Sequence, residues 1–187
     1  RPLYEMEDQG VELTILWADS AGNLQYADFE GALRKNTRAI VCTHGSNLTG
    51  NLLDIESLAR VCRRYGAYLL GDNAHGAYLK FLPRDIHPIT LGADICCDSA
   101  HKTLPVLTGG AYLHVSENAP EFMGEYAENA MSLFASTSPS YIIMQSLDMA
   151  NRYISDGYCE KLEYCAKIIS DMKKFVQLNK EYKELTP

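Results

Sequence analysis

The sequence lacks the features that mark several large classes of protein. None of its apolar stretches is long enough to span a membrane, and the first residues carry no signal-peptide pattern. Basic residues are not in excess, because 17 lysines and arginines stand against 24 acidic residues and the net charge is −7. We therefore expect neither a nucleic-acid partner nor a membrane partner.

Motifs for disulfide, zinc and serine or cysteine chemistry are also missing. The six cysteines show no Cys-x-x-Cys spacing, and most of them lie in apolar segments. The simplest interpretation is a reduced chain in the cytoplasm. A Gly-x-Ser-x-Gly motif is absent, and no Cys/His pair is recognisable, so nucleophilic serine or cysteine catalysis is disfavoured.

What the sequence does contain is an alternation of short apolar runs and amphipathic stretches. This pattern predicts an α/β protein with a mostly parallel sheet covered on both faces, a three-layer α/β/α arrangement with a helical C-terminal part. We expect one domain over residues 1–187. The predicted strands are 11–16, 37–43, 67–70, 94–97 and 110–115, and the predicted helices are 26–34, 54–65, 120–133, 141–154 and 157–177.

Chemically versatile side chains follow three of these predicted strands. His44 to Asn47 follow the strand ending at Thr43, Asp72 and His75 follow the next strand, and Asp98 to Lys102 follow the third. Because ligands collect at the carboxyl ends of strands in open α/β sheets, these groups are expected to meet at one edge. A lysine there, next to the apolar stretch 104–106, favours the free amine and imine chemistry.

Plainer interpretations of the same residues remain. A single lysine after a strand is usually a solvated surface group, and a lone aspartate there is usually a cap or turn former. A metal site is a sharper alternative, because Asp72-x-x-His75 and Asp98-x-x-His101 repeat one pattern at two strand ends. That alternative leaves Lys102 without a role, and we predict no metal.

Three segments in the middle of the chain carry a family resemblance. They are GDNAHGA at 71–77, GAD at 92–94 and SAHKTLPVLT at 99–108. Together they are similar to the major domain of the ornithine/lysine/arginine decarboxylases, which are pyridoxal-phosphate enzymes of fold type I. STSPS at 136–140 also resembles that family's segment downstream of the lysine.

The opening third resembles a different branch of the same fold. RPLY at 1–4, GVELT at 10–14 and THGSNLTG at 43–50 are similar to class V aminotransferases and cysteine desulfurases. Both branches use the same cofactor, so the resemblance implies pyridoxal 5'-phosphate in either case. The substrate differs between the branches, and the sequence does not select it.

The resemblance also implies roles for individual residues. Lys102 would form the Schiff base, an internal aldimine, with the cofactor aldehyde, and Asp72 would face the pyridine nitrogen and keep it protonated. His75 and Asn47 match positions near the phenolic oxygen of the cofactor. Two further residues, Ser99 and His101, match contacts to the phosphate or the ring. The segment at 136–137 would reach the phosphate of a neighbouring subunit.

By the same resemblance, the function is that of a pyridoxal-phosphate-dependent amino-acid decarboxylase, with Lys102, Asp72 and His75 as catalytic residues. The alternatives are a class V aminotransferase or desulfurase-like lyase, or a non-catalytic fragment that keeps the fold. The family pattern places a phosphate loop before residue 1 and a small domain after residue 187. We therefore expect a piece of a larger enzyme, which forms a homodimer and binds a small amino-acid substrate.

Overall fold

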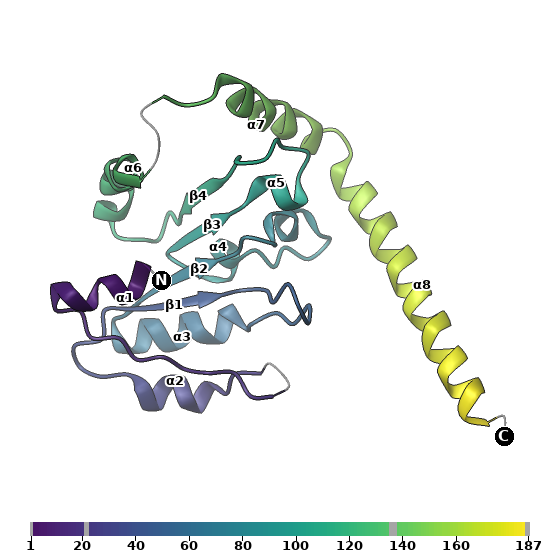
Figure 1. Cartoon of the computed structure of the whole chain (residues 1–187), viewed down its shortest axis with the longest axis horizontal. Coiled ribbons are helices and arrows are strands. Elements are labelled where there is room, and N and C mark those ends of the chain that lie inside the picture. Colours follow the sequence, from purple (N-terminus) through teal and green to yellow (C-terminus); the bar gives the residue numbers. More distant parts are fainter. Residues whose placement is uncertain (1, 21–22, 135–137, 186–187) are drawn as a thin grey trace.

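The computed structural model describes residues 2–20, 23–134 and 138–185 (Figure 1). Its centre is a four-stranded sheet in the order β1-β2-β3-β4, with helices on both sides. The first three strands are parallel, and β4 pairs antiparallel with β3. The strands are β1 (Ala39–Thr43), β2 (Tyr68–Asp72), β3 (Ile95–Asp98) and β4 (Tyr112–Val115). The predicted α/β class and mostly parallel sheet are thus confirmed.

One face of the sheet is covered by α3 (Ile55–Tyr65), a helix whose ends are fixed by its sequence. Asp54 caps the helix by accepting a hydrogen bond from the Ser57 amide at 3.0 Å, and Gly66 ends it with a left-handed φ of 67°. Its apolar side packs on β2. The core it forms is completely or almost completely buried and consists of Phe29, Ile55, Leu58, Ala59, Cys62, Leu69 and Ala93. Each large aliphatic side chain buried there contributes about 1.5–3 kcal/mol.

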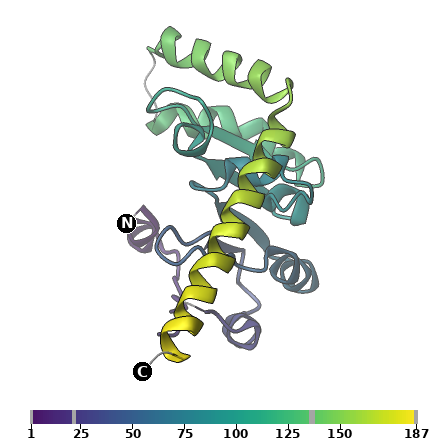
Figure 2. The same cartoon turned by 90° about the vertical axis from the view of Figure 1, so that its right-hand side faces the viewer.

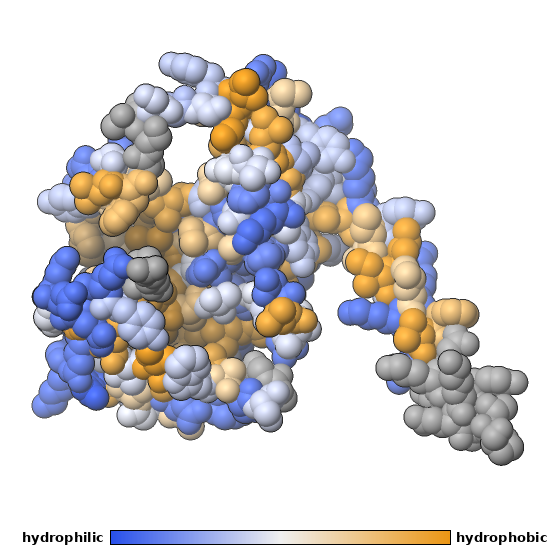
Figure 3. Space-filling model, in the orientation of Figure 1, coloured by the Kyte–Doolittle hydropathy of each residue, from blue (hydrophilic) through white to orange (hydrophobic). Residues whose placement is uncertain are grey.

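The opposite face of the sheet is only partly covered. The helix α6 (Glu121–Phe134) reaches it through Phe122, whose ring meets that of Tyr68 edge-on at 6.0 Å. Farther across this face Val41 remains 50% exposed and Leu113 37% exposed. Apolar side chains gather in the hollow between α6 and the N-terminal segment (Figure 3). Helices therefore lie on both sides of the sheet, as predicted, but on this side they leave part of the sheet exposed.

The N-terminal segment differs from the sequence-based expectation. Residues 11–16 form no strand, although their apolar content predicts one. Strand structure needs a neighbouring strand to bond to, and this segment pairs with none of the described ones. An ion pair between Glu12 and Arg34 attaches it instead, and Leu16 packs against the core. The ordered elements of this part are α1 (Pro2–Glu5), η1 (Glu7–Gln9) and α2 (Tyr26–Ala32).

The C-terminal third is helical, as predicted. α7 (Tyr141–Ile154) leads into α8 (Tyr158–Leu185), which extends away from the sheet as a single straight helix (Figures 1 and 2). Tyr158 anchors the start of α8, because it is buried and its ring meets that of Phe81 edge-on at 5.6 Å. None of the described helices is long and apolar enough to cross a membrane. Three short helices complete the fold: η2 (Ala77–Phe81), α4 (Pro88–Leu91) and α5 (Ala100–Thr103).

Candidate active site

The strand register brings the candidate segments to one edge of the sheet. Thr43, the last residue of β1, is paired with Asp72, the last residue of β2. Asp72 is in turn paired with Cys97 on β3, one residue before that strand ends. The loop after β1, the turn after β2 and α5 after β3 therefore start side by side (Figure 1).

Lys102 lies on α5 and is in contact with His75. Its Nζ is 3.2 Å from the His75 Nε2, and both side chains are exposed. The apolar surroundings expected for this lysine are not found. Leu104 is turned into a separate core cluster with Ala77, Ala100 and Tyr158. The lysine is thus held by an imidazole at an open surface rather than enclosed by aliphatic groups.

Asp72 lies at the same edge with its carboxylate exposed. One oxygen, Oδ1, accepts a hydrogen bond from the Ala74 amide at 3.0 Å. This bond fixes the orientation of the carboxylate at the start of the turn that leads to His75. The turn continues into Gly76, where an added Cβ would lie 2.0 Å from the Asn73 Oδ1, so only glycine fits.

The remaining predicted site residues are spread around this edge. Asn47 is exposed in the loop after β1, and Ser99 precedes α5 without making a capping hydrogen bond to it. His101 is half-buried, and its Nδ1 donates to the Gly110 carbonyl oxygen at 2.9 Å. This leaves its Nε2 as the acceptor nitrogen. The predicted contact at 136–137 lies outside the described residues.

Beneath this surface lies a chain of buried side chains that we call the buried polar network. The Asn73 Nδ2 donates to the Asp98 Oδ1 at 2.8 Å, and the Asn73 Oδ1 accepts from the His44 Nδ1 at 2.9 Å. The other carboxylate oxygen, Asp98 Oδ2, accepts from the Nε2 atoms of His87 at 3.0 Å and His114 at 2.9 Å. Only His114 in this network is partly exposed.

The network sets the charge of its members. Burial opposes ionisation of Asp98, but the hydrogen bonds from His114, His87 and Asn73 outweigh it and hold the Asp98 pKa well below its usual range. Burial lowers the pKa of His44, although its bond to Asn73 acts in the other direction. The network therefore holds one carboxylate anion that is stabilised by hydrogen-bond donors.

The network divides the residues of the metal alternative. Asp98 is buried with His87 and His114, and these are the only three described side chains that gather as a possible ligand set. Asp72, His75 and His101 are not part of that set. The sequence alone does not mark His87, His114 or Asn73 as functional candidates. The available signal for His114 is that it lies two residues after Tyr112, so that both face the same side of the predicted strand. The sequence does not show which strand pairs with it.

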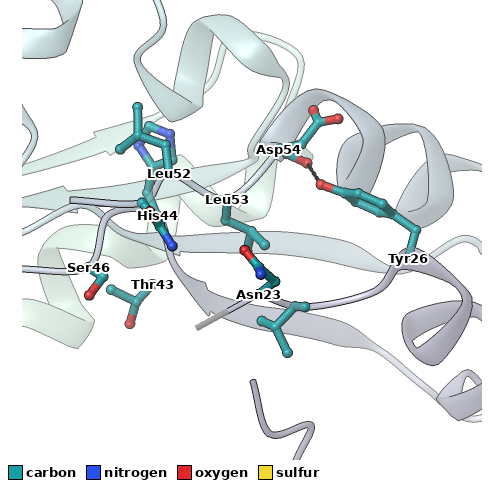
Figure 4. A pocket seen from close by; sticks show the side chains of 10 residues that line it. Asn23, Tyr26, Thr43, His44, Ser46, Leu52, Leu53 and Asp54 are labelled. Atoms are coloured by element: carbon teal, nitrogen blue, oxygen red, sulfur yellow. Dashed lines mark hydrogen bonds between the residues drawn. The ribbon is translucent and has the colours of Figure 1, made fainter. Parts of the chain in front are cut away.

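A pocket opens beside the end of β1 (Figure 4). Thr43, His44 and Ser46 line one part of it, and the Tyr26 hydroxyl closes another by donating to the Asp54 carbonyl oxygen at 3.1 Å. Neither Lys102 nor Asp72 is among its lining residues. The pocket thus lies next to the Asn47 loop and apart from the lysine.

Comparison with known protein families shows to which family the chain belongs. Residues 21–187 match the family described as Orn/Lys/Arg decarboxylase, major domain. The chain belongs to this family. The Orn/Lys/Arg decarboxylase major domain is a fold-type-I pyridoxal-phosphate enzyme domain, so the resemblance seen in the central segments is confirmed.

Individual relatives come from both branches of the fold. The chain is 30% identical over 109 residues to an arginine decarboxylase of Bacillus cereus, covering 57% of this chain and 23% of that protein. It is 34% identical over 93 residues to a probable cysteine desulfurase of Mycolicibacterium paratuberculosis, covering 50% and 13%. The solved cysteine desulfurase of Thermococcus onnurineus superposes with a TM-score of 0.64 and 22% identity, over 85% of this chain and 43% of that one. The chain therefore spans less than half of each.

Proposed function

We propose that this chain carries the lysine centre of a pyridoxal-phosphate-dependent amino-acid decarboxylase. The observation that supports it best is the contact of the Lys102 Nζ with the His75 Nε2 at 3.2 Å. Lys102 follows β3, while His75 and Asp72 lie at the end of the neighbouring strand β2. The donor set fits the cofactor, because it offers an amine for an aldehyde and a carboxylate for a pyridinium nitrogen. When bound, pyridoxal phosphate supplies that aldehyde and a cationic ring that withdraws electrons from the substrate.

Lys102 acts as the nucleophile in this proposal, and an amine is nucleophilic only without its extra proton. The His75 Nε2 is within hydrogen-bonding distance of the Nζ and can accept that proton. The same imidazole can later return a proton to the lysine nitrogen or to the substrate carbon. His75 therefore serves as the proton carrier of the site.

Asp72 stabilises positive charge. Its carboxylate, oriented by the Ala74 amide, would keep a proton on the ring nitrogen of the cofactor. Asn47 would donate to the phenolic oxygen, and Ser99 and His101 would contact the phosphate or the ring. These assignments follow the family resemblance, and the strand register that brings the ends of β1, β2 and β3 to one edge supports them.

A desulfurase-like or aminotransferase-like reaction is the second candidate. It is favoured by the similarity to a probable cysteine desulfurase and by the HGSNLTG segment that follows β1. The same Lys102, Asp72 and His75 would serve in it. We further propose that the full-length protein is a cytoplasmic homodimer, the arrangement expected of the family.

The test is to incubate the full-length protein with pyridoxal 5'-phosphate, reduce it with borohydride and identify the modified peptide by mass. We expect one cofactor on Lys102, none in Lys102→Ala, and normal labelling in Lys35→Ala, which changes an exposed lysine elsewhere. Labelling that persists in Lys102→Ala, or that is absent in the unmodified protein, would refute the proposal.

The reaction type is separated by products. Ornithine, lysine, arginine and cysteine are supplied in turn, and carbon dioxide, keto acid and sulfide are measured. Release of carbon dioxide from a basic amino acid, lost in Lys102→Ala, supports the decarboxylase. Sulfide from cysteine, or a keto acid, supports the second candidate.

A further inference from the structure

The buried polar network connects the two strands that carry the proposed catalytic groups. Asn73 directly follows Asp72 at the end of β2, and Asp98 ends β3 four residues before Lys102. The hydrogen bond from the Asn73 Nδ2 to the Asp98 Oδ1, 2.8 Å long, joins these two points. Both side chains are almost completely buried, 1% and 3% exposed.

A metal ion does not explain the network. The His87 Nδ1 accepts a hydrogen bond from the Ile89 amide at 3.3 Å, so the proton of this imidazole is on Nε2. That Nε2 points at the Asp98 carboxylate, where a metal would need its lone pair. Hydrogen bonds alone account for the arrangement, because the ionised Asp98 carboxylate accepts from both imidazoles and from the Asn73 amide group.

The position of the Asn73–Asp98 bond gives it a particular consequence. The β2–β3 pairing ends at Asp72 and Cys97. One more backbone hydrogen bond follows, from the Asn73 amide to the Cys97 carbonyl oxygen at 2.9 Å, and then the side-chain bond from Asn73 to Asp98. Beyond it the chain leaves the sheet toward α5. The side-chain bond is therefore the last connection between the strands before Lys102.

Asp98 is in turn fixed from two other elements. His87 caps α4, which packs on β3, and His114 lies in β4, the antiparallel neighbour of β3. Nitrogen donors from three other segments thus hold the Asp98 carboxylate, so its position does not depend on the exposed groups of the site.

We propose that the Asn73–Asp98 pair positions Asp72 relative to Lys102, and so determines how well the cofactor is held. This inference rests on the proposed function. Asn73 and Asp98 touch neither substrate nor cofactor in it. They are positioning residues that act through the turn carrying Asp72 and His75 and through the segment carrying Lys102.

An exchange of the two residues tests the proposal in the full-length protein. In Asp98→Asn the one side-chain oxygen is needed by the two imidazoles, so the new amide nitrogen faces the Asn73 Nδ2 and two donors meet. Asn73→Asp instead places two carboxylates together. The double variant Asn73→Asp/Asp98→Asn restores a donor–acceptor pair. In it the amide introduced at position 98 donates to the carboxylate introduced at position 73, and its oxygen still accepts from the imidazoles. The matched control is Asp94→Asn. Asp94 bonds the Leu69 amide at 2.8 Å and joins the same strands at their other end.

The measurements are the affinity for pyridoxal 5'-phosphate by visible absorbance, the midpoint of thermal unfolding, and the rate at which trinitrobenzenesulfonate labels Lys102 without cofactor. We expect each network single variant to weaken the affinity about tenfold or more, as losing an outer hydrogen bond does at metal sites, and the exchange to recover most of it. Lys102 labelling should slow in the single variants and recover likewise. Asp94→Asn should change neither the cofactor affinity nor the labelling rate, because its amide oxygen can still accept from the Leu69 amide.

The proposal is overturned if the double variant is as defective as the single variants, or if Asp94→Asn weakens cofactor binding as much as Asp98→Asn. If the unmodified protein does not bind the cofactor at Lys102, the proposed function fails. The network is then judged by labelling alone: slowing in the single variants with recovery in the exchange supports the positioning role, and unchanged labelling refutes it.

Discussion

The same short pattern, Asp-x-x-His, has opposite environments in two regions of this molecule. At 72–75 the aspartate and the histidine are both exposed, and the histidine contacts Lys102. At 98–101 the aspartate is almost completely buried and accepts hydrogen bonds from Asn73, His87 and His114, while the histidine turns to the Gly110 carbonyl oxygen. One copy leaves its groups open for chemistry, and the other holds the sheet together.

Strand alternation explains this difference. Leu69 and Gly71 are buried on the side of β2 that faces α3 and α4, so Asp72 points to the other side. On β3 it is Cys96 that is buried, and Asp98, two residues later, points to the same side as Cys96. A carboxylate at a strand end is therefore structural or available according to its parity with the core residues before it.

The largest effect on stability is expected for Asp98→Ala. The change leaves the two imidazole donors and the Asn73 amide without their acceptor in a buried place. We expect the free energy of unfolding to fall by about 3 kcal/mol or more, because each donor left without its acceptor costs about 1–3 kcal/mol. Urea denaturation measures it, and a loss below about 1 kcal/mol would show that the network is not a stabilising unit.

A smaller loss is expected for Asn73→Ala. This change removes one hydrogen bond to Asp98 and leaves the His44 Nδ1 proton unsatisfied, which costs about 1–3 kcal/mol. The control is Asn47→Ala, the same substitution at an exposed position of the neighbouring loop, with an expected change within about 0.5 kcal/mol. Equal losses in the two variants would contradict the distinction between the regions.

Much of the sheet could be predicted because its signals are local. The apolar runs before Thr43, Asp72 and Asp98 each form a strand within two residues of the expected position, and α3 lies between the Asp54 cap and Gly66 that predict it. The helix-like apolar spacing of the C-terminal third also predicts that Met123, Met131, Met144 and Met149 fill the core, but three of these four are exposed. Met123 is 8% exposed, while Met131, Met144 and Met149 are 46–62% exposed. Apolar spacing shows that a helix has a face to cover, but not what covers it.

The buried polar network could not be predicted because its members are far apart in the sequence. His87 and His114 meet because β4 runs antiparallel to β3 and α4 begins beside it. The sequence alone predicts Asp98 at a strand end, as found, but groups it with Asp72. It does not show which of Cys96 and Cys97 is buried, and therefore not which side of β3 Asp98 faces. The resemblance to the family selected Lys102, and the structure added its contact with His75.

The stability of the fold should also depend on pH, because the buried polar network contains a histidine with a lowered pKa. Burial lowers the pKa of His44, so the folded state binds fewer protons than the unfolded state as the pH falls through about 6.5. Stability should therefore decrease between about pH 7 and pH 5, by about 1.4 kcal/mol for each unit of depression. His44→Gln, which keeps an amide donor for the Asn73 oxygen, should flatten this part of the curve. An unchanged slope in His44→Gln would contradict the buried, neutral histidine.

The smallest effect on stability, and the one that separates the regions most clearly, is expected for Asp72→Asn. The side chain is exposed and its bond to the Ala74 amide can be kept by the new amide oxygen, so the free energy of unfolding should change by no more than about 0.5 kcal/mol. The charge that would hold a proton on the cofactor ring is lost, however, and turnover of the full-length protein should fall about a hundredfold or more. Parallel urea curves and initial rates measure the two quantities. Asp94→Ala, which removes the acceptor of the Leu69 amide just before β3, should give the reverse result: a measurable loss of stability with turnover retained. If Asp72→Asn instead loses stability and keeps its turnover, then Asp72 belongs with the buried network in function, and the division between an exposed chemical edge and a buried structural one is wrong.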